Sequence, residues 1–228
     1  HVMRYSRWFS TICVTLSDSG WIAGTGMKRG ADLREIDEHS DLVVIWGGNP
    51  VNTQVNVMNH ALAAKRRGAT LVVVDPYRTG TADHADLHLA VRPGTDGALA
   101  CAVMHVLFAE GFADWDYLRA YTDAPDELAQ HVATRTPEWA AAETGISAQL
   151  IRVTARELAS HRPAALVHPG RRVNWYGDDT QRSRANALLN ALLGNWGRKG
   201  GLFVQAGLSV PSYPLPKYPK SDKPMADN

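Results

Sequence analysis

The chain has 228 residues, 45% of them hydrophobic and 21% charged, which is the composition of an ordinary folded protein and excludes disordered, collagen-like and coiled-coil classes. Its 24 Lys and Arg residues against 23 Asp and Glu residues give a formal net charge of +1, which does not favour nucleic acid as the main partner. No apolar run reaches the length of a bilayer span, and two cysteines are too few for a disulfide framework or an all-cysteine zinc site.

The two ends of the chain indicate a piece of something larger. The opening HVMRYSRWF has neither an initiator Met at position 1 nor the charged and apolar regions of a signal peptide. Residues 208–228 are rich in proline and lack helical or strand periodicity, so we expect an extended linker there. We expect residues 1–40 to belong to an adjoining domain and residues 41–207 to form the main domain.

The first clear elements form a strand–helix–strand unit. Residues 41–46 are apolar and predict a buried strand that ends in a Gly-Gly-Asn-Pro turn. Residues 55–67 predict a helix with basic residues in its last turn and Gly68 as its stop. Residues 70–74 predict a second buried strand. A unit of this kind predicts parallel strands joined by a right-handed crossover.

The remaining segments continue this alternation. Further strands are expected at residues 87–91 and 164–168. Further helices are expected at residues 97–110, over most of 115–161 with breaks at Pro125, Pro137 and Gly145 and an N-cap at Ser147, and at 180–193 before Gly194. The sequence therefore predicts an α/β fold, a parallel Rossmann-like sheet flanked by helices, as part of a larger multi-domain subunit.

Three loops are expected to leave the strands at one edge of the sheet, where ligands of such folds bind. In the first, Gly47 and Gly48 permit close backbone approach, and the following helix start offers N–H groups to a phosphate. The loop has neither the dinucleotide-binding glycine pattern nor a P-loop lysine. A plain strand-to-helix turn with Asn49 or Thr53 as the cap is an equally good interpretation of the loop by itself.

The other two loops each carry an acidic residue. Asp75 ends the second strand, where a carboxylate accepts hydrogen bonds from ribose hydroxyls; the local alternative is an Asx-turn before Pro76. Asp96 could pair with the N1–H and the exocyclic amine of guanine; the local alternative is that Thr95 or Asp96 caps the next helix. Together the three loops predict a nucleotide site.

Two arginines and two cysteines are further candidates. Arg171 and Arg172 lie in a loop after a strand, and a planar guanidinium binds oxyanions well, although most such pairs are merely solvated. Cys101 lies in an apolar helix and is expected to be core packing. Cys13, judged from its neighbours alone, is expected to be buried and inert, although thiolate is also a natural ligand for a soft metal. The histidines show no zinc-site spacing.

In their order along the chain, five segments resemble the catalytic subunit of the molybdopterin oxidoreductases of the dimethyl sulfoxide reductase family. They are IWGGNPVNTQ (45–54), GATLVVVDPYRT (68–79), ADLHLAVRPGTDGAL (85–99), TPEWAAAETGI (136–146) and NALLNALLGNWGRKGG (186–201). The resemblance implies a bis(molybdopterin guanine dinucleotide) cofactor with molybdenum or, less expected, tungsten, bound by residues 41–207. The implied cofactor-binding residues are Trp46, Gly47, Gly48, Asn49, Thr53, Asp75, Pro76, Arg78, Gly94, Thr95 and Asp96.

The resemblance also assigns roles at the metal. Cys13 falls where the family places its metal ligand, which reverses the expectation of an inert residue. Residues 168–185, HPGRRVNWYGDDTQRSRA, look most like thiosulfate, polysulfide and arsenic oxyanion reductases, and place Arg172, or failing that Arg171, opposite the metal. The implied reaction is two-electron reduction of a small sulfur substrate (thiosulfate, polysulfide or tetrathionate) or of an arsenic oxyanion. The alternatives are a formate dehydrogenase or nitrate reductase, or a non-catalytic nucleotide-binding scaffold.

The resemblance implies partners outside this chain. A [4Fe-4S] cluster would lie in a preceding N-terminal part, and an iron–sulfur electron-transfer subunit, with or without a membrane anchor subunit, would complete the enzyme. Relatives with this loop type are usually exported in the folded state, which favours the periplasm over the cytoplasm. The 228-residue piece alone is expected to be inactive, because it lacks half of the cofactor's binding groups.

Overall fold

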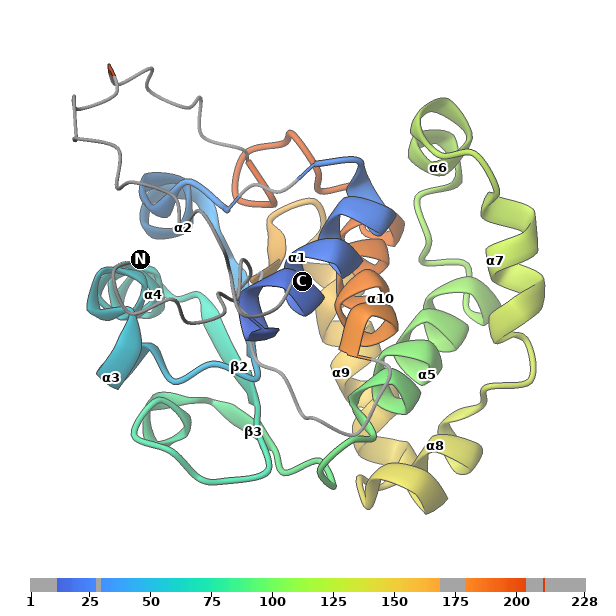
Figure 1. Cartoon of the computed structure of the whole chain (residues 1–228), viewed down its shortest axis with the longest axis horizontal. Coiled ribbons are helices and arrows are strands. Elements are labelled where there is room, and N and C mark those ends of the chain that lie inside the picture. The colour runs from blue at the N-terminus through green and yellow to red at the C-terminus, as the bar shows by residue number, and fades with distance from the viewer. Residues whose placement is uncertain (1–11, 28–29, 169–178, 204–210, 212–228) are drawn as a thin grey trace, which may run out of the picture.

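The computed structural model describes residues 12–27, 30–168, 179–203 and 211, and these form a parallel sheet with helices on both faces (Figure 1). The strands are β1 (Leu42–Trp46), β2 (Thr70–Val74), β3 (Leu87–Leu89) and β4 (Ala165–His168). They are hydrogen-bonded in the order β3-β2-β1-β4, and every neighbouring pair is parallel. The predicted α/β class is therefore confirmed.

From α4 onward, the helices of the described residues begin and end close to the predicted boundaries. They are α1 (Ile12–Thr25), α2 (Leu33–His39), α3 (Pro50–Thr53), α4 (Val55–Arg67), α5 (Asp96–Ala109), α6 (Trp115–Tyr121), α7 (Pro125–Val132), α8 (Pro137–Thr144), α9 (Ala148–Ser160) and α10 (Asp179–Leu192), with a 3-10 turn at Ala82–His84. Gly68 ends α4 in the left-handed conformation, at φ +112°, and the Ser147 side chain caps α9 by accepting from the Leu150 N–H. Helices α1, α2 and α3 were not predicted.

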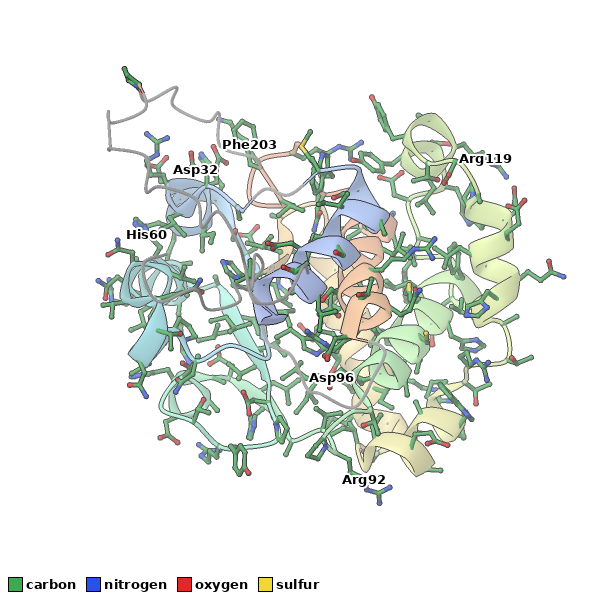
Figure 2. The ribbon with its side chains drawn as sticks, in the orientation of Figure 1. Asp32, His60, Arg92, Asp96, Arg119 and Phe203 are labelled. Atoms are coloured by element: carbon green, nitrogen blue, oxygen red, sulfur yellow. The ribbon has the colours of Figure 1, made fainter. Side chains whose placement is uncertain are left out.

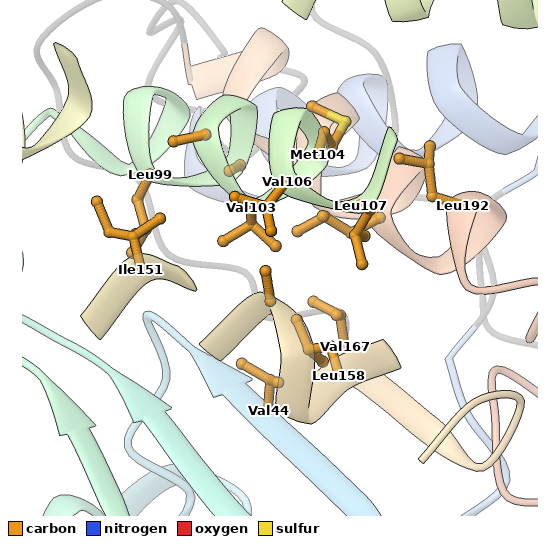
Figure 3. Close-up of a cluster of buried hydrophobic side chains, with 14 of the residues drawn as sticks. Val44, Leu99, Val103, Met104, Val106, Leu107, Ile151, Leu158, Val167 and Leu192 are labelled. Atoms are coloured by element: carbon orange, nitrogen blue, oxygen red, sulfur yellow. The ribbon is translucent and has the colours of Figure 1, made fainter. Parts of the chain in front are cut away.

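The two faces of the sheet bury separate cores because side chains alternate along each strand. Val44 of β1 and Val167 of β4 pack against α5, α9 and α10, where Leu107 and Leu158 are among the fully buried side chains (Figure 3). The next residue along β1, Ile45, joins the other core, to which α1, α2 and α4 contribute Trp21, Ile36 and Met58 respectively. All five residues of β1 are buried, as expected of a central parallel strand.

Helices α1 and α10 lie side by side in the same direction (Figure 1). The Thr180 hydroxyl donates to the Leu16 carbonyl (3.3 Å), and the Ser183 hydroxyl donates to the Ser17 hydroxyl (3.4 Å). Further along both helices, a β-carbon added to Gly24 would lie 2.8 Å from the Cβ of Ala187. Both helices therefore begin at the same end of the molecule, the end at which the strands finish.

Within the residues that the structure describes, no helix is both long enough and apolar enough to cross a membrane.

Candidate cofactor site

The predicted site residues lie where β1, β2 and β3 end, which we call the carboxyl edge of the sheet. Trp46 is the last residue of β1, and Asp96 is the first residue of α5, which follows β3. The Trp46 indole Nε1 donates to Asp96 Oδ1 at 3.0 Å, and the two residues are 3% and 4% exposed. A buried hydrogen bond thus joins two of the three predicted loops.

The loop after β1 exposes its backbone at Gly48. Gly47 is buried and adopts φ +65°, which favours glycine, and its N–H donates to the Val74 carbonyl of β2 at 2.8 Å. Gly48 is partly exposed, and a β-carbon added to it would come no closer than 3.7 Å to another residue, the Ile45 side chain. The part of this loop that a ligand could approach is therefore Gly48.

Neither predicted cap of this loop is formed. Asn49 occupies the N-cap position of α3, but its side chain makes no capping bond; instead Asn49 Oδ1 accepts from the Thr81 hydroxyl at 2.7 Å. Thr53 ends α3 and donates its hydroxyl to the Asn49 carbonyl at 3.0 Å, while Gln54 is the N-cap of α4. The capping interpretation was wrong, because the Asn49 side chain is hydrogen-bonded to Thr81, 32 residues away in the sequence, and not to the helix N-terminus.

The predicted Asx-turn at Asp75 is confirmed. Asp75 is only 2% exposed, its Oδ1 accepts from the Tyr77 N–H at 2.9 Å, and Pro76 lies half-buried between them. The turn takes one of the roughly four acceptor positions that a carboxylate offers. Arg78 is exposed and its Nε donates to Asp83 Oδ1 at 2.9 Å.

The turn before α5 also lacks the side-chain cap predicted for Thr95. Gly94 takes φ +86°, and the Thr95 hydroxyl donates back to the Arg92 carbonyl at 2.8 Å. Thr95 stands at the N-cap position but its side chain makes no capping bond, so the prediction that Thr95 caps α5 was wrong. Arg92 donates to the Ala142 carbonyl at 2.7 Å and ties this turn to α8 at the rim of the molecule (Figure 2).

A cavity of about 740 Å³ lies beside this turn. Its lining includes Gly94 and Thr95 together with Arg182 and Arg184 of α10, and Cys101 of α5. Cys101 is half-buried, and burial raises the pKa of its thiol, which agrees with the predicted packing role. Among the described residues, no group of three or more His, Cys, Asp or Glu side chains is arranged to hold a metal ion.

The residues expected at the metal are placed only in part. Cys13 lies in the first turn of α1, but the position of its side chain is outside what the structure describes. Arg171 and Arg172 lie in 169–178, which is also outside the described residues. This segment joins the end of β4 to the start of α10, so both of its neighbours lie at the carboxyl edge.

His168 is a residue of this edge that the sequence interpretation used only as part of a strand. It is the last residue of β4, is 7% exposed, and lies opposite Ile45 in the sheet register. Burial lowers the pKa of its imidazole from 6.5 to about 4, so the ring is neutral at physiological pH. Its place directly after an apolar run, at a strand end, is the sequence signal that could have identified it.

The chemistry of the edge fits a nucleotide. Asp75 and Asp96 bring two buried carboxylates, which suit hydroxyl and N–H donors, and the position of a β-carbon on Gly48 is free of close contacts at the strand end. These are the kinds of group that a nucleotide needs.

Comparisons with known proteins agree with this geometry. The family model described as molybdopterin oxidoreductase matches residues 14–211. Probable oxidoreductase YoaE of Bacillus subtilis is 31% identical over 92% of this chain and 31% of its own length. Thiosulfate reductase molybdopterin-containing subunit PhsA of Salmonella typhimurium is 35% identical over 79% of this chain and 24% of its own length. Formate dehydrogenase H of Escherichia coli is 35% identical over 77% of this chain and 24% of its own length.

Among solved structures, acetylene hydratase from Pelobacter acetylenicus matches with a TM-score of 0.72 and 26% identity, over 81% of this chain and 25% of that one. The chain therefore spans only a quarter to a third of the length of these relatives. On the family match and these relatives, this chain belongs to the molybdopterin oxidoreductase family.

Proposed function

We propose that this chain is the dinucleotide-binding part of a molybdenum or tungsten enzyme that reduces a small sulfur or arsenic oxyanion by two electrons. The observation that carries the proposal is the meeting of the Gly47–Gly48 loop, Asp75 and Asp96 at one edge of a parallel sheet. The likeness to a thiosulfate reductase subunit supports the substrate class. The equal identity to a formate dehydrogenase makes formate the second candidate substrate.

In this proposal the cofactor is bis(molybdopterin guanine dinucleotide). Gly47, Gly48, Asn49 and Thr53 would lie along its phosphates. The guanosine would meet two groups of residues, which are Asp75, Pro76 and Arg78 after β2 and Gly94, Thr95 and Asp96 before α5. When bound, the metal and its dithiolenes would supply the two-electron redox chemistry.

The direction of α1 supports Cys13 as the metal ligand. Cys13 lies in the first turn of α1, whose N-terminus is beside that of α10. Two helix N-termini with parallel dipoles favour a negative charge, so a cysteine there is held more readily as the thiolate that binds a soft metal. The same field would favour an anionic substrate.

Arg172, with Arg171 as the alternative, would attract that substrate and stabilise the charge that develops on its leaving group. The support is positional, because the described elements before and after this segment, the end of β4 and the start of α10, lie at the carboxyl edge. A permanently charged guanidinium at this place would recognise a small anion of either candidate class, so the choice between an oxyanion of sulfur or arsenic and formate depends on the turnover measurements below.

Two substitutions in the cofactor-loaded protein test these roles separately. Cys13→Ala should abolish both bound metal and turnover, whereas Arg172→Ala should keep the metal and lower turnover of thiosulfate, tetrathionate or arsenate by about a hundredfold or more. Arg171→Ala tests the alternative position: a loss of turnover there and not in Arg172→Ala would assign the role to Arg171. Full metal content and activity in Cys13→Ala would remove Cys13 as the ligand, and faster turnover of formate than of every oxyanion would establish the second candidate.

The proposal extends to the whole enzyme. A [4Fe-4S] cluster in a preceding part and an iron–sulfur electron-transfer subunit, with or without a membrane anchor subunit, would provide the electron path to an enzyme in the periplasm. A non-catalytic scaffold needs no such path, so iron that copurifies with molybdenum or tungsten would exclude the scaffold alternative.

A further inference from the structure

The hydrogen bond between Trp46 and Asp96 does more than satisfy a buried indole. We propose that Trp46 is a positioning residue that holds the Asp96 carboxylate so that the site accepts guanine and rejects other bases; this inference rests on the proposed cofactor. Trp46 Nε1 lies 3.0 Å from Asp96 Oδ1, between residues that are 50 positions apart in the sequence and less than 5% exposed.

Both partners are held by rigid elements. Trp46 ends β1, which pairs with β2 on one side and β4 on the other, and its Cα partner in β2 is Val74. Asp96 begins α5, whose next buried residue, Leu99, is fully enclosed in the core. The turn before Asp96 is tied down at Arg92, whose N–H donates to the Thr144 carbonyl at 2.9 Å. The carboxylate therefore has a fixed place and a fixed rotation.

The chemistry of the base explains why a fixed rotation matters. Guanine presents two neighbouring donors, N1–H and the 2-amino group, which match the two oxygens of an ionised carboxylate. Cytosine and adenine each present one amino donor beside an unprotonated ring nitrogen, which would face a carboxylate oxygen lone pair to lone pair. A carboxylate that can turn relieves this repulsion, whereas one held by an indole N–H cannot.

Trp46 also occupies one defined oxygen of the carboxylate, since an indole N–H can only donate and here donates to Asp96 Oδ1. Loss of this donor would remove one of the contacts that hold the carboxylate in the orientation suited to guanine. Specificity is then set by the difference in fit between bases and not by the strength of guanine binding alone.

The test is the nucleotide content of Trp46→Phe in the cofactor-loaded protein, made in a host that builds both the guanine and the cytosine dinucleotide forms. Acid release should give GMP from the unchanged protein, and the GMP-to-CMP ratio should fall by about tenfold or more in Trp46→Phe, since a hydrogen bond to a charged group is lost. Asp96→Asn should shift the ratio in the same direction.

Trp21→Phe is the matched control, because Trp21 is as buried as Trp46 (4% exposed) but belongs to the core around α1 and α2. It should lose stability without a change in the nucleotide ratio. An unchanged ratio in Trp46→Phe, or in Asp96→Asn where the first variant does not fold, would overturn the inference. Absence of any nucleotide from the unchanged protein would instead overturn the proposed function itself.

Discussion

Gly20 of α1 lies directly against the backbone of Thr180 in α10, so closely that a β-carbon on Gly20 would overlap the Thr180 carbonyl oxygen and lie 2.5 Å from the Cβ of Ser183. Hydrogen is the only side chain that fits there. This contact lets two parallel helices approach closely and brings the first turn of α1, with Cys13, to the end of the molecule where α10 begins.

Substitution of Gly20 should therefore be costly. Gly20→Ala is expected to lower the free energy of unfolding by about 1–3 kcal/mol, because the added methyl forces α1 away from α10. Gly97→Ala is the matched control, since Gly97 is also a helical glycine but an added β-carbon meets nothing within 4 Å; it should raise stability by up to about 1 kcal/mol. Denaturant titration measures both, and equal effects would contradict the close packing.

The buried imidazole of His168 should make stability depend on pH. Its folded pKa of about 4 is below the ordinary 6.5, so the unfolded chain binds the proton more tightly than the folded chain does. The contribution of the neutral His168 to the free energy of unfolding should be fully present above about pH 6.5. It should be lost as the pH drops toward 4, a loss of about 3 kcal/mol. The plot of unfolding free energy against pH should be flatter for His168→Leu than for the parent, and for the exposed His84→Gln it should have the same slope as for the parent. Parallel pH profiles of His168→Leu and parent would contradict the burial.

Asn190 should be among the least replaceable residues of α10. Its Oδ1 accepts from the Val167 N–H and its Nδ2 donates to the Val167 carbonyl, both at 3.0 Å, so the side chain pairs with the outer side of β4 as a neighbouring strand would. Asn190 is fully buried. Asn190→Asp removes the donor and introduces a buried charge, and should lower the free energy of unfolding by about 2–4 kcal/mol. The exposed Asn59→Asp should change it by less than about 0.5 kcal/mol.

Arg78 offers a test that separates cofactor binding from folding. Its ion pair with Asp83 is exposed, with side chains 64% and 61% accessible, so Arg78→Ala should change the stability of the cofactor-free protein by less than about 1 kcal/mol. In the loaded protein, Arg78→Ala should increase the loss of nucleotide on dialysis. Arg66→Ala, at an exposed position of α4, should not. Equal nucleotide retention in both variants would remove Arg78 from the site.

Apart from the short α3 and the 3-10 turn at Ala82–His84, the elements from β1 onward were predictable because turn and capping residues mark their ends. Gly68 stops α4, Pro125 and Pro137 open α7 and α8, and Ser147 caps α9. Helix α1 was not predictable because Gly20 weakens the local helical preference, and the helix is held by α10, more than 150 positions later.

In the candidate site, the positions of the residues were predictable from the sequence, but their hydrogen-bond partners were not. Trp46, Asp75 and Asp96 were placed correctly at strand ends and at the start of α5, because an apolar run or a turn signal stops beside each of them. Their partners were not predictable, since the bonds from Trp46 to Asp96 and from Thr81 to Asn49 join loops that are distant in the sequence. Local capping rules were overridden by these tertiary contacts.

The central claim is that this chain holds a guanine dinucleotide form of the pterin cofactor with a metal. The measurement to make is elemental analysis together with acid release of nucleotide from the intact gene product, made in a host that builds the cofactor. We expect molybdenum or tungsten with about two GMP per metal. Neither metal nor GMP in that protein would refute the cofactor assignment and would favour the scaffold alternative.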